Sequence, residues 1–464
     1  MLNPEHSYWH DTLKAIRRCG RKLIEFELLF TLVSAGIIVP SFGWLLRHLI
    51  AKTGNVTITN YDLIAFAMSP YGLLFMIITL FSSFTVFFTQ RAGVTILAAS
   101  GLYDIPIGPV RALIFATARL PVFIHLGSIY AACLLLLSVP FMGLGYLIFS
   151  VFLQGHDINY YLYFKPVEWY LALSSMAFLA LLYLLISLYL WAKAAFSLTI
   201  IVSETTDALT ALKRSWQLSA GNERAIMWHA AGWWLRIGAL LYPLMLLISW
   251  GADSLLDRVS LTLSAELAML ALVSALIFML SATWSLLGMF GEAFIILLLY
   301  RQLGEKPAGL ERLGRETVKK TSELSIYTLS GVLVTTFLIM LGLGVYALSS
   351  EPQRDEILIS AHRAGAARAS ENTLAALRLA IAEKADYAEI DVQTAADGTL
   401  MVLHDADLMR IAGDPRRVAN LSASEIQQLD AGRWHSAAFA GESVPTLLQM
   451  LNEARNKIGL NIEL

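Results

Sequence analysis

Charged residues are scarce in this chain of 464 residues: 15% are Asp, Glu, Lys or Arg, against 57% hydrophobic residues. That balance is typical of a membrane protein. The 34 basic and 36 acidic residues nearly cancel, so no excess of positive charge indicates a nucleic acid as the partner. Cysteine is scarcer still, since Cys19 and Cys133 are the only two. The part after residue 350 therefore has no disulfide framework.

Long apolar runs, by contrast, fill the chain up to residue 350. A helix needs about 20 residues to cross a bilayer, and within lipid only a helix or a closed barrel satisfies the backbone. The stretch 264–299 is long enough for one tilted helix or a tight hairpin. We predict a multi-pass helical membrane domain at 1–350 with seven spanning stretches, at residues 23–46, 69–89, 121–153, 168–192, 226–250, 264–299 and 327–349.

Basic residues gather in alternate loops between these stretches. The cluster from Lys14 to Lys22 precedes the first stretch, which lacks a clear cleavage site and is predicted to be an uncleaved anchor. Positive charge accumulates on the cytoplasmic side. We therefore predict an integral membrane protein with a cytoplasmic N-terminus and the C-terminal domain on the outer side. A hairpin at 264–299 would reverse that location.

Two features of the apolar part leave alternatives open. In residues 204–222, Leu209, Leu212 and Trp216 recur at helical spacing, which fits either an interfacial helix or a helix packed on the bundle. Ionisable residues within the predicted spans suggest a transport pathway, although structural pairing or snorkelling is the favoured interpretation. These residues are His125, Arg236, Glu266 and Glu292.

After residue 350 the apolar runs shorten, and strand-like and helix-like segments alternate. This alternation predicts an α/β domain with parallel strands, at residues 355–464. The predicted helices cover residues 370–384, capped by Ser370, and 446–458. The predicted strands cover residues 357–362, 387–392, 399–404 and 459–464.

Ionisable residues fall at the ends of these strands. Glu389 and Asp391 are two residues apart, so they share one face of a strand. His362, His404 and Glu463 stand at or near the ends of the other predicted strands. Each residue alone is more often a cap or a solvated group. Together they predict one polar rim at the C-terminal ends of the strands, where α/β barrels place their active sites.

The types of these residues indicate phosphoryl chemistry. Carboxylates suit a hard cation, Ca²⁺ or Mg²⁺, better than zinc. Two histidines supply an acid and a base near neutral pH. Arg363 follows His362 and offers a guanidinium to phosphate oxygens. A metal site, an acid, a base and a guanidinium together predict hydrolysis or transfer of a phosphate ester.

The segments that carry these residues resemble the successive motifs of glycerophosphodiester phosphodiesterases: "AHRAGAARASENTLAALRLAI", "YAEIDVQTAADGTLMVLHDADLMR", "AGRWHSAAFAGESVPTLLQML" and "LNIEL". The hydrophobic part is similar to the membrane domain fused to some bacterial members, which implies a bacterial inner or plasma membrane as the location. The resemblance implies a TIM barrel that hydrolyses glycerophosphodiesters to an alcohol and glycerol 3-phosphate. It also implies roles for individual residues: His362 and His404 as acid and base, Arg363 as phosphate ligand, Glu389, Asp391 and Glu463 as metal ligands, and Glu371 as a supporting residue.

Two departures from the family pattern shape the expectations. The family usually has His-Arg-Gly where this chain has "HRA" at 362–364.

The second departure is length. A TIM barrel typically needs about 250 residues, whereas the predicted domain covers only residues 355–464. We therefore expect a truncated domain that resembles the first half of a barrel and self-associates through its open edges. The expected partners are the glycerophosphodiester substrate and membrane lipids. The alternative is a catalytically inactive membrane protein that binds lipid or a partner.

Overall fold

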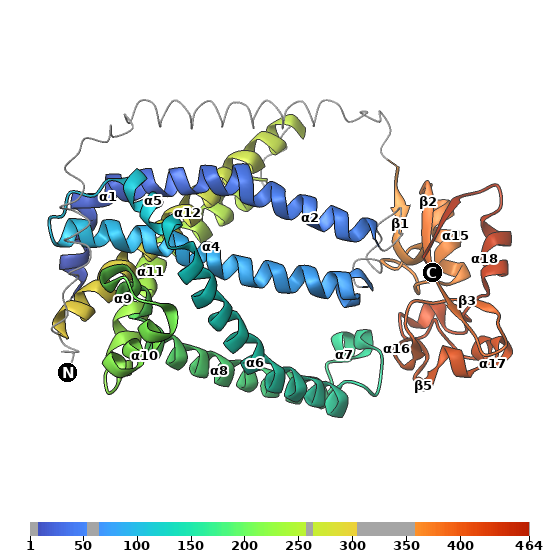
Figure 1. The fold of residues 1–464 in the computed structure, drawn as a ribbon. Coiled ribbons are helices and arrows are strands. Elements are labelled where there is room, and N and C mark those ends of the chain that lie inside the picture. Colours follow the sequence, from blue (N-terminus) through green and yellow to red (C-terminus); the bar gives the residue numbers. More distant parts are fainter. Residues whose placement is uncertain (1–7, 53–64, 257–262, 304–357, 464) are drawn as a thin grey trace. The chain divides into compact units, whose positions relative to one another are not determined.

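The computed structural model describes residues 8–52, 65–256, 263–303 and 358–463 (Figure 1). The chain forms two compact units. One contains Met1–Ser138 and Leu184–Gly342, and the other contains Val139–Tyr183 and Leu343–Leu464. The predicted domain boundary near residue 350 lies outside the described residues.

Within the described ranges, six helical stretches are long and apolar enough to cross a membrane. α12 is one continuous helix, so the stretch 264–299 is not a hairpin. Six of the seven predicted stretches fall on these helices, and 327–349 lies outside the described residues. The first helix is α1 (Tyr8–Val33), which continues through a π-helical turn (Ser34–Ile38) into α2 (Val39–Ala51); the others are α4 (Pro70–Leu102), α6 (Leu120–Phe152), α8 (Val167–Ala194) with α9 (Ser197–Glu204), α11 (Glu223–Leu256) and α12 (Leu263–Gln302).

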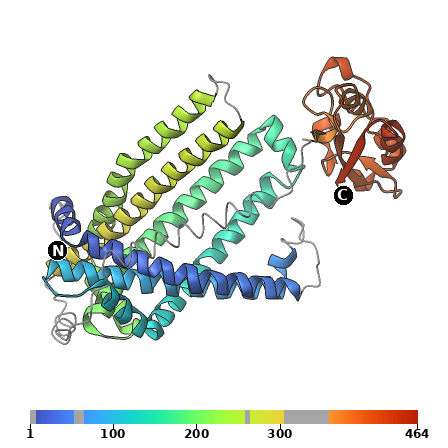
Figure 2. The ribbon, with the colours of Figure 1, turned by 90° about the horizontal axis from the view of Figure 1, so that it is seen from above.

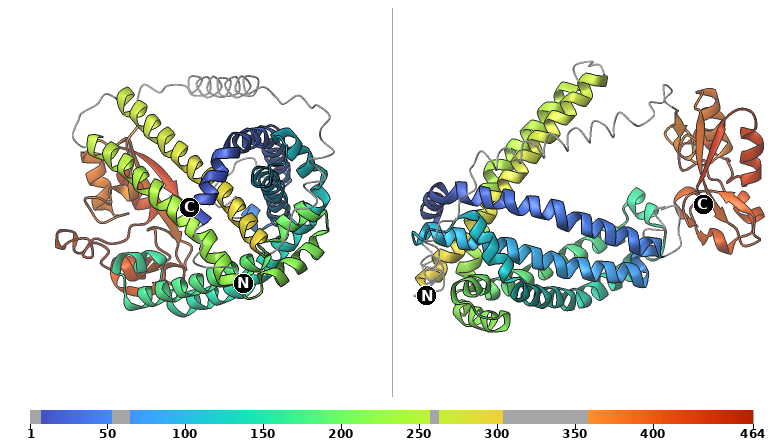
Figure 3. Two further views of the ribbon diagram at one scale, coloured as in Figure 1. Left: turned by 90° about the vertical axis from the view of Figure 1, so that its left-hand side faces the viewer. Right: turned by 45° about the horizontal axis from the view of Figure 1, so that its top comes forward.

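Glycines allow close helix packing in the first unit. α1 lies along α4 (Figure 1 and Figure 3), and α11 lies along α12 (Figure 2). A Cβ at Gly93 would lie 2.0 Å from Phe26 Cζ, and one at Gly291 would lie 1.8 Å from Trp233 Cε2. Phe26 and Trp233 are both buried. These contacts are the close approaches that small residues permit between membrane helices.

The ionisable residues within the helices are partly explained by pairing. Arg91 contacts Glu292 at 2.9 Å, and Trp234 Nε1 donates to the same carboxylate at 3.1 Å. Glu292 is therefore paired, as the structural interpretation predicts. The guanidinium of Arg236 lies 5.9 Å from the ring centre of Trp9. His125 is exposed, and the side chain of Glu266 lies outside the described residues.

The amphipathic segment forms the helix α10 (Ala208–Ser219), which directly follows α9 in the chain. A further short helix, α5 (Pro109–Ala118), lies between α4 and α6. Asp207 caps it by accepting from the N–H groups of Leu209 and Thr210. Its buried face consists of small residues: Ala208, Ala211, Ser215 and Ser219. Leu209 and Trp216 are exposed. The helix therefore packs through its small residues and presents large apolar side chains outward.

The C-terminal part contains a parallel sheet with β2 at its centre. β1 (Ser360–Ala361) and β6 (Gly459–Glu463) both pair with β2 (Tyr387–Thr394) in parallel. α15 (Leu374–Ala382) connects β1 to β2, and α18 (Leu447–Ala454) precedes β6. The three parallel strands β1, β2 and β6 thus lie side by side, with a helix before β2 and another before β6, which is the arrangement that opens a TIM barrel. The predicted fold class is confirmed.

One predicted strand runs in the other direction. β3 (Leu400–Val402) pairs antiparallel with β2, with Val392 opposite Val402. The turn between them is too short for the crossover that a parallel pair requires. The prediction of parallel strands is therefore wrong for β3. The following excursion contains β4 (Asp407–Leu408), α16 (Met409–Ala412), β5 (Asp414–Arg417) and α17 (Ala423–Gln427).

The cap of α15 also differs from the prediction. Thr373, not Ser370, is the N-cap, and its hydroxyl accepts from the Ala376 N–H at 3.3 Å. Ser370 donates instead to the Ala431 carbonyl at 2.5 Å and accepts from Trp434 Nε1 at 3.0 Å. Serine and threonine are both good caps, so the tertiary partners of Ser370 decide which residue begins the helix.

Candidate active site

Three carboxylates converge between the middle of β2 and the end of β6. Glu389 and Asp391 project from one face of β2 because they are two residues apart. The register of the sheet places Glu463 of β6 directly beside Asp391. One oxygen from each of the three carboxylates lies within 4.8 Å of the others. The sheet alone therefore builds an acidic group of the size that a single cation occupies.

The surroundings of this acidic group fit a hard cation. Asp391 is buried, and Asn372 Nδ2 donates to its Oδ2 at 2.8 Å. Arg363 Nε lies 3.9 Å from Asp391 Oδ2. Three carboxylates beside one guanidinium leave an excess of negative charge, and an all-oxygen donor set suits Ca²⁺ or Mg²⁺.

Arg363 lies in an unusual backbone conformation. Three successive residues have positive φ: Arg363 (48°), Ala364 (62°) and Gly365 (117°). The left-handed conformation costs a non-glycine residue about 1–2 kcal/mol. The fold keeps it because the Arg363 N–H donates to Glu389 Oε2 at 2.7 Å, which ties the turn to β2. The left-handed φ of Ala364 also explains why a glycine suits this position.

The guanidinium of Arg363 is only partly satisfied. Its Nη1 donates to Glu371 Oε1 at 3.0 Å. Its Nε is buried and makes no hydrogen bond with any residue that the structure describes. A buried donor without an acceptor costs free energy. An anionic ligand beside the acidic group would supply that acceptor.

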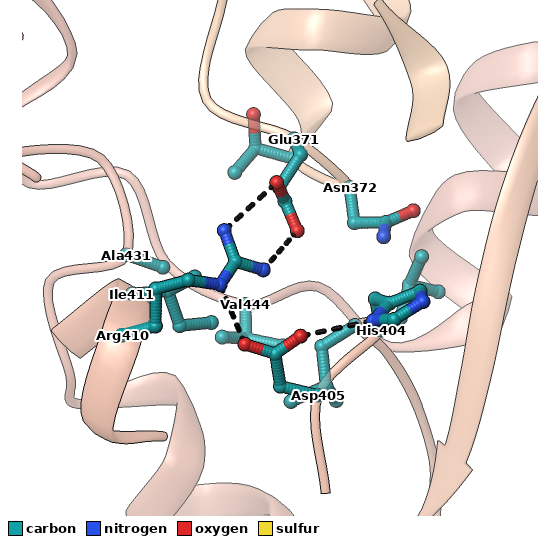
Figure 4. Close-up of a pocket in the computed structure, with 11 residues that line it drawn as sticks. Glu371, Asn372, His404, Asp405, Arg410, Ile411, Ala431 and Val444 are labelled. Carbon is teal, nitrogen blue, oxygen red and sulfur yellow. Dashed lines mark hydrogen bonds and ion pairs between the residues drawn. The ribbon is translucent and has the colours of Figure 1, made fainter. Parts of the chain in front are cut away.

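His404 belongs to a relay of charged side chains whose middle members, Asp405 and Arg410, are buried (Figure 4). Its Nδ1 lies 2.9 Å from Asp405 Oδ1. An ionised carboxylate can only accept, so Nδ1 carries the proton and Nε2 is left for a substrate. Asp405 Oδ2 accepts from Arg410 Nε at 2.6 Å, and the two terminal nitrogens of Arg410 donate to Glu371 at 3.0 and 2.6 Å. Glu371 thus connects Arg410 to Arg363.

The relay shifts the pKa values of its members. The hydrogen bond to Asp405 raises the pKa of His404, and burial opposes the rise only in part. Burial alone would raise the pKa of Asp405, yet hydrogen bonds from His404 and Arg410 hold that pKa below its usual range. The charge of Arg363 lowers the pKa of His404 and the charge of Asp391 raises it, so both act on this imidazole.

Replacing Arg410 with alanine should destabilise the C-terminal domain strongly. The side chain is buried, and its loss removes the guanidinium between the buried Asp405 carboxylate and Glu371, which then keep only His404 and Arg363. Breaking one member of a buried charge network costs about 3–5 kcal/mol. Arg416→Ala is the matched control because Arg416 pairs with Asp414 at the surface and should change little. Denaturant unfolding of the two variants should separate them, and equal stability would contradict the structural role of Arg410.

The predicted site residues are brought together to different degrees. Glu389, Asp391 and Glu463 converge, and Glu371 joins the two arginines. His362 lies directly after β1, at the level of Glu389 in the parallel register. It is exposed, and no hydrogen bond of its ring to another described residue is present.

Three residues of the site escape the sequence analysis: Asn372, Asp405 and Arg410. Asp405 directly follows His404 and Asn372 directly follows Glu371, so adjacency is the signal that could have found them. Arg410 gives no comparable signal, because its partner Glu371 is 39 residues away.

The comparisons with known families cover both parts of the chain. The family "Membrane domain of glycerophosphoryl diester phosphodiesterase" matches residues 9–343. The chain belongs to this family. It is therefore an integral membrane protein. The "Glycerophosphoryl diester phosphodiesterase family" matches residues 362–464, which contain the whole site.

Individual relatives match the C-terminal part. A glycerophosphodiester phosphodiesterase of Caldanaerobacter subterraneus is 39% identical over 108 residues, which is 23% of this chain and 44% of that protein. One of Bacillus subtilis is 35% identical over 106 residues, or 21% of this chain and 36% of that protein. The crystal structure of a glycerophosphodiester phosphodiesterase from Agrobacterium tumefaciens covers 23% of this chain and 46% of its own, with 41% identity and a TM-score of 0.23. The chain thus spans about half the length, or less, of the curated relatives it matches.

Proposed function

We propose that this protein hydrolyses glycerophosphodiesters to an alcohol and glycerol 3-phosphate, with a divalent cation held by Glu389, Asp391 and Glu463. The family of residues 362–464 supports the reaction class. The observation that carries the proposal is the convergence of these carboxylates beside Arg363, whose buried Nε has no acceptor among the described residues. An anionic oxygen of a phosphodiester would supply the acceptor that this Nε lacks.

The residues divide the reaction between them. Water attacks phosphorus, and His362 takes the proton of the attacking oxygen. In the other route the neighbouring glycerol hydroxyl attacks first, also losing its proton to His362, and gives a cyclic phosphate that water then opens to glycerol 3-phosphate. The bond from phosphorus to the alcohol breaks, and His404 donates a proton from Nε2 to the departing oxygen. Arg363 binds a phosphate oxygen. A cation bound by the carboxylates would neutralise the charge that develops on the phosphate oxygens.

The direct test is release of glycerol 3-phosphate from glycerophosphocholine by the purified full chain. Release that requires Ca²⁺ or Mg²⁺ and stops with chelator supports the proposal. No release under any of these conditions would overturn it, and would favour the alternative of a membrane protein that binds lipid or a partner without catalysis.

Asp405→Asn should shift the pH dependence of hydrolysis and thereby assign the role of His404. The hydrogen bond to Asp405 raises the pKa of His404, so a neutral asparagine should lower that pKa. An acid works while protonated, so the basic limb of the pH profile of kcat should move to lower pH. Movement of the acidic limb instead would make His404 the base. Asp414→Asn, which changes a carboxylate that pairs with Arg416 outside the relay, should leave both limbs in place.

We also infer that the N-terminus is cytoplasmic and that the C-terminal domain lies on the outer side. The alternation of basic loops supports this orientation. α12 is a single helix, and so the reversal that a hairpin at 264–299 would cause does not occur. A membrane-impermeant thiol reagent should then label a cysteine placed at the exposed Arg433 in intact cells. Labelling only after the membrane is opened would contradict the inference.

A further inference from the structure

The second unit contains a helical hairpin as well as the catalytic residues. It consists of the end of α6, the short helix α7 (Ile158–Phe164) and the start of α8. Phe141 of α6 and Tyr183 of α8 make an edge-to-face contact, with ring centres 5.1 Å apart. At the tip, Asp157 Oδ1 caps α7 by accepting from the Asn159 N–H at 2.9 Å. The tip is therefore a defined structure rather than an open loop.

Asp157 also binds the segment that follows His404. Its N–H donates to Asp407 Oδ2 at 2.6 Å, and its own Oδ2 accepts from the Ala406 N–H at 3.1 Å. One residue thus donates to this segment and accepts from it. The two oxygens of the Asp157 carboxylate have different partners: Oδ1 caps α7, and Oδ2 accepts from Ala406.

Two further contacts reach both ends of the charged relay. Asn159 Nδ2 lies 3.4 Å from His404 Nδ1. That Nδ1 already donates to Asp405 at 2.9 Å, so Asn159 packs against the imidazole rather than bonding to it. At the other end, the ring of Tyr163 contacts that of Trp434, with centres 5.5 Å apart. Trp434 in turn lies under the Arg410 guanidinium, at 5.0 Å.

The topology of the chain permits this contact. The hairpin tip and the C-terminal domain are separated by α8, α11, α12 and the predicted stretch 327–349. With the predicted stretch 327–349 as the fourth crossing after α8, α11 and α12, the chain is expected to return to the same side of the membrane, and the tip and the domain to face one compartment.

We propose that the tip of this membrane hairpin, residues 155–164, is a positioning element of the active site: it docks on residues 405–407 and so fixes the imidazole of His404. Asp157 is the anchor of this contact. The role in positioning rests on the proposed function, whereas the docking does not. The membrane domain is then part of the catalytic apparatus in addition to holding it at the membrane.

Docking is tested by a disulfide that does not depend on activity. The full chain with Cys133→Ser, His156→Cys and Ala406→Cys, which keeps the Asp157 carboxylate and the Ala406 N–H that it binds, should form the disulfide on mild oxidation in native membranes. The control pair Glu168→Cys and Ala406→Cys should not, because Glu168 lies beyond the tip, exposed on α8. Absence of the first disulfide, or equal formation of both, overturns the docking.

Positioning is tested by Asp157→Asn in the full chain. Asparagine keeps an oxygen for the cap of α7 but puts an NH₂ group where Ala406 needs an acceptor. We expect kcat for glycerophosphocholine to fall roughly tenfold with KM unchanged, because small displacements of a catalytic group reduce the chemical step. Glu168→Gln should match the wild type. An unchanged kcat in Asp157→Asn would sink the positioning role, and an inactive wild type that still forms the disulfide would remove the proposed function while leaving the docking in place.

Discussion

His404→Ala should reduce the release of glycerol 3-phosphate by about 10²–10⁴-fold, the usual contribution of a positioned acid or base. The loss should appear in kcat, since the ring acts on a proton in the transition state rather than in binding the substrate. The side chain is partly exposed on one side and fixed by Asp405 on the other, so its removal leaves no buried cavity. A steady-state assay across pH with glycerophosphocholine measures the effect.

His48→Ala is the control for this prediction. His48 is exposed on α2, where its ring stacks on Trp44, and it belongs to the other unit. If the wild type, His404→Ala and His48→Ala unfold at the same midpoint, the loss of activity in His404→Ala comes from the chemical step and not from a loss of stability. If His404→Ala kept more than a tenth of the wild-type kcat, the acid role would be wrong.

The convergence of the carboxylates could be predicted from the sequence because it follows from local periodicity. The alternation in "YAEIDV" places Glu389 and Asp391 on one face whatever the strand pairs with. The position of Glu463 late in "GLNIEL" suggested the same rim, and the register of β6 against β2 then sets it opposite Asp391. Likewise, the apolar runs predict the spanning helices because length and composition decide them. The catalytic roles of these residues remain predictions.

The relay could not be predicted because its contacts are long-range. Glu371 and Arg410 pair only because the chain after β3 folds back over the start of α15. The direction of β3 depends on the turn before it, and a strand-like pattern alone does not give a direction. The contact of Asp157 with Asp407 joins residues 250 positions apart. No pattern within either segment indicates the other.

Asp391→Asn should abolish the dependence on cation and reduce hydrolysis by about 10³-fold or more. A bound cation supplies several kcal/mol of charge stabilisation, and each 1.36 kcal/mol is tenfold in rate. Asparagine has the same shape as aspartate but no negative charge, so the substitution removes only the charge. In the wild type Asn372 Nδ2 donates to Asp391 Oδ2 at 2.8 Å, and the amide oxygen of asparagine can accept the same hydrogen bond. The fold of β2 should therefore survive while the cation loses its buried ligand.

Cation binding can be measured apart from turnover. The thermal midpoint of the wild type should rise with Ca²⁺ or Mg²⁺, since a ligand that binds the folded state stabilises it, and chelator should reverse the rise. Asp391→Asn should show no rise. Glu383→Gln, a change to an exposed carboxylate that pairs with Arg368, should respond as the wild type does. A cation-dependent midpoint that persists in Asp391→Asn would place the cation elsewhere, and the carboxylates of β2 and β6 would then serve Arg363 alone.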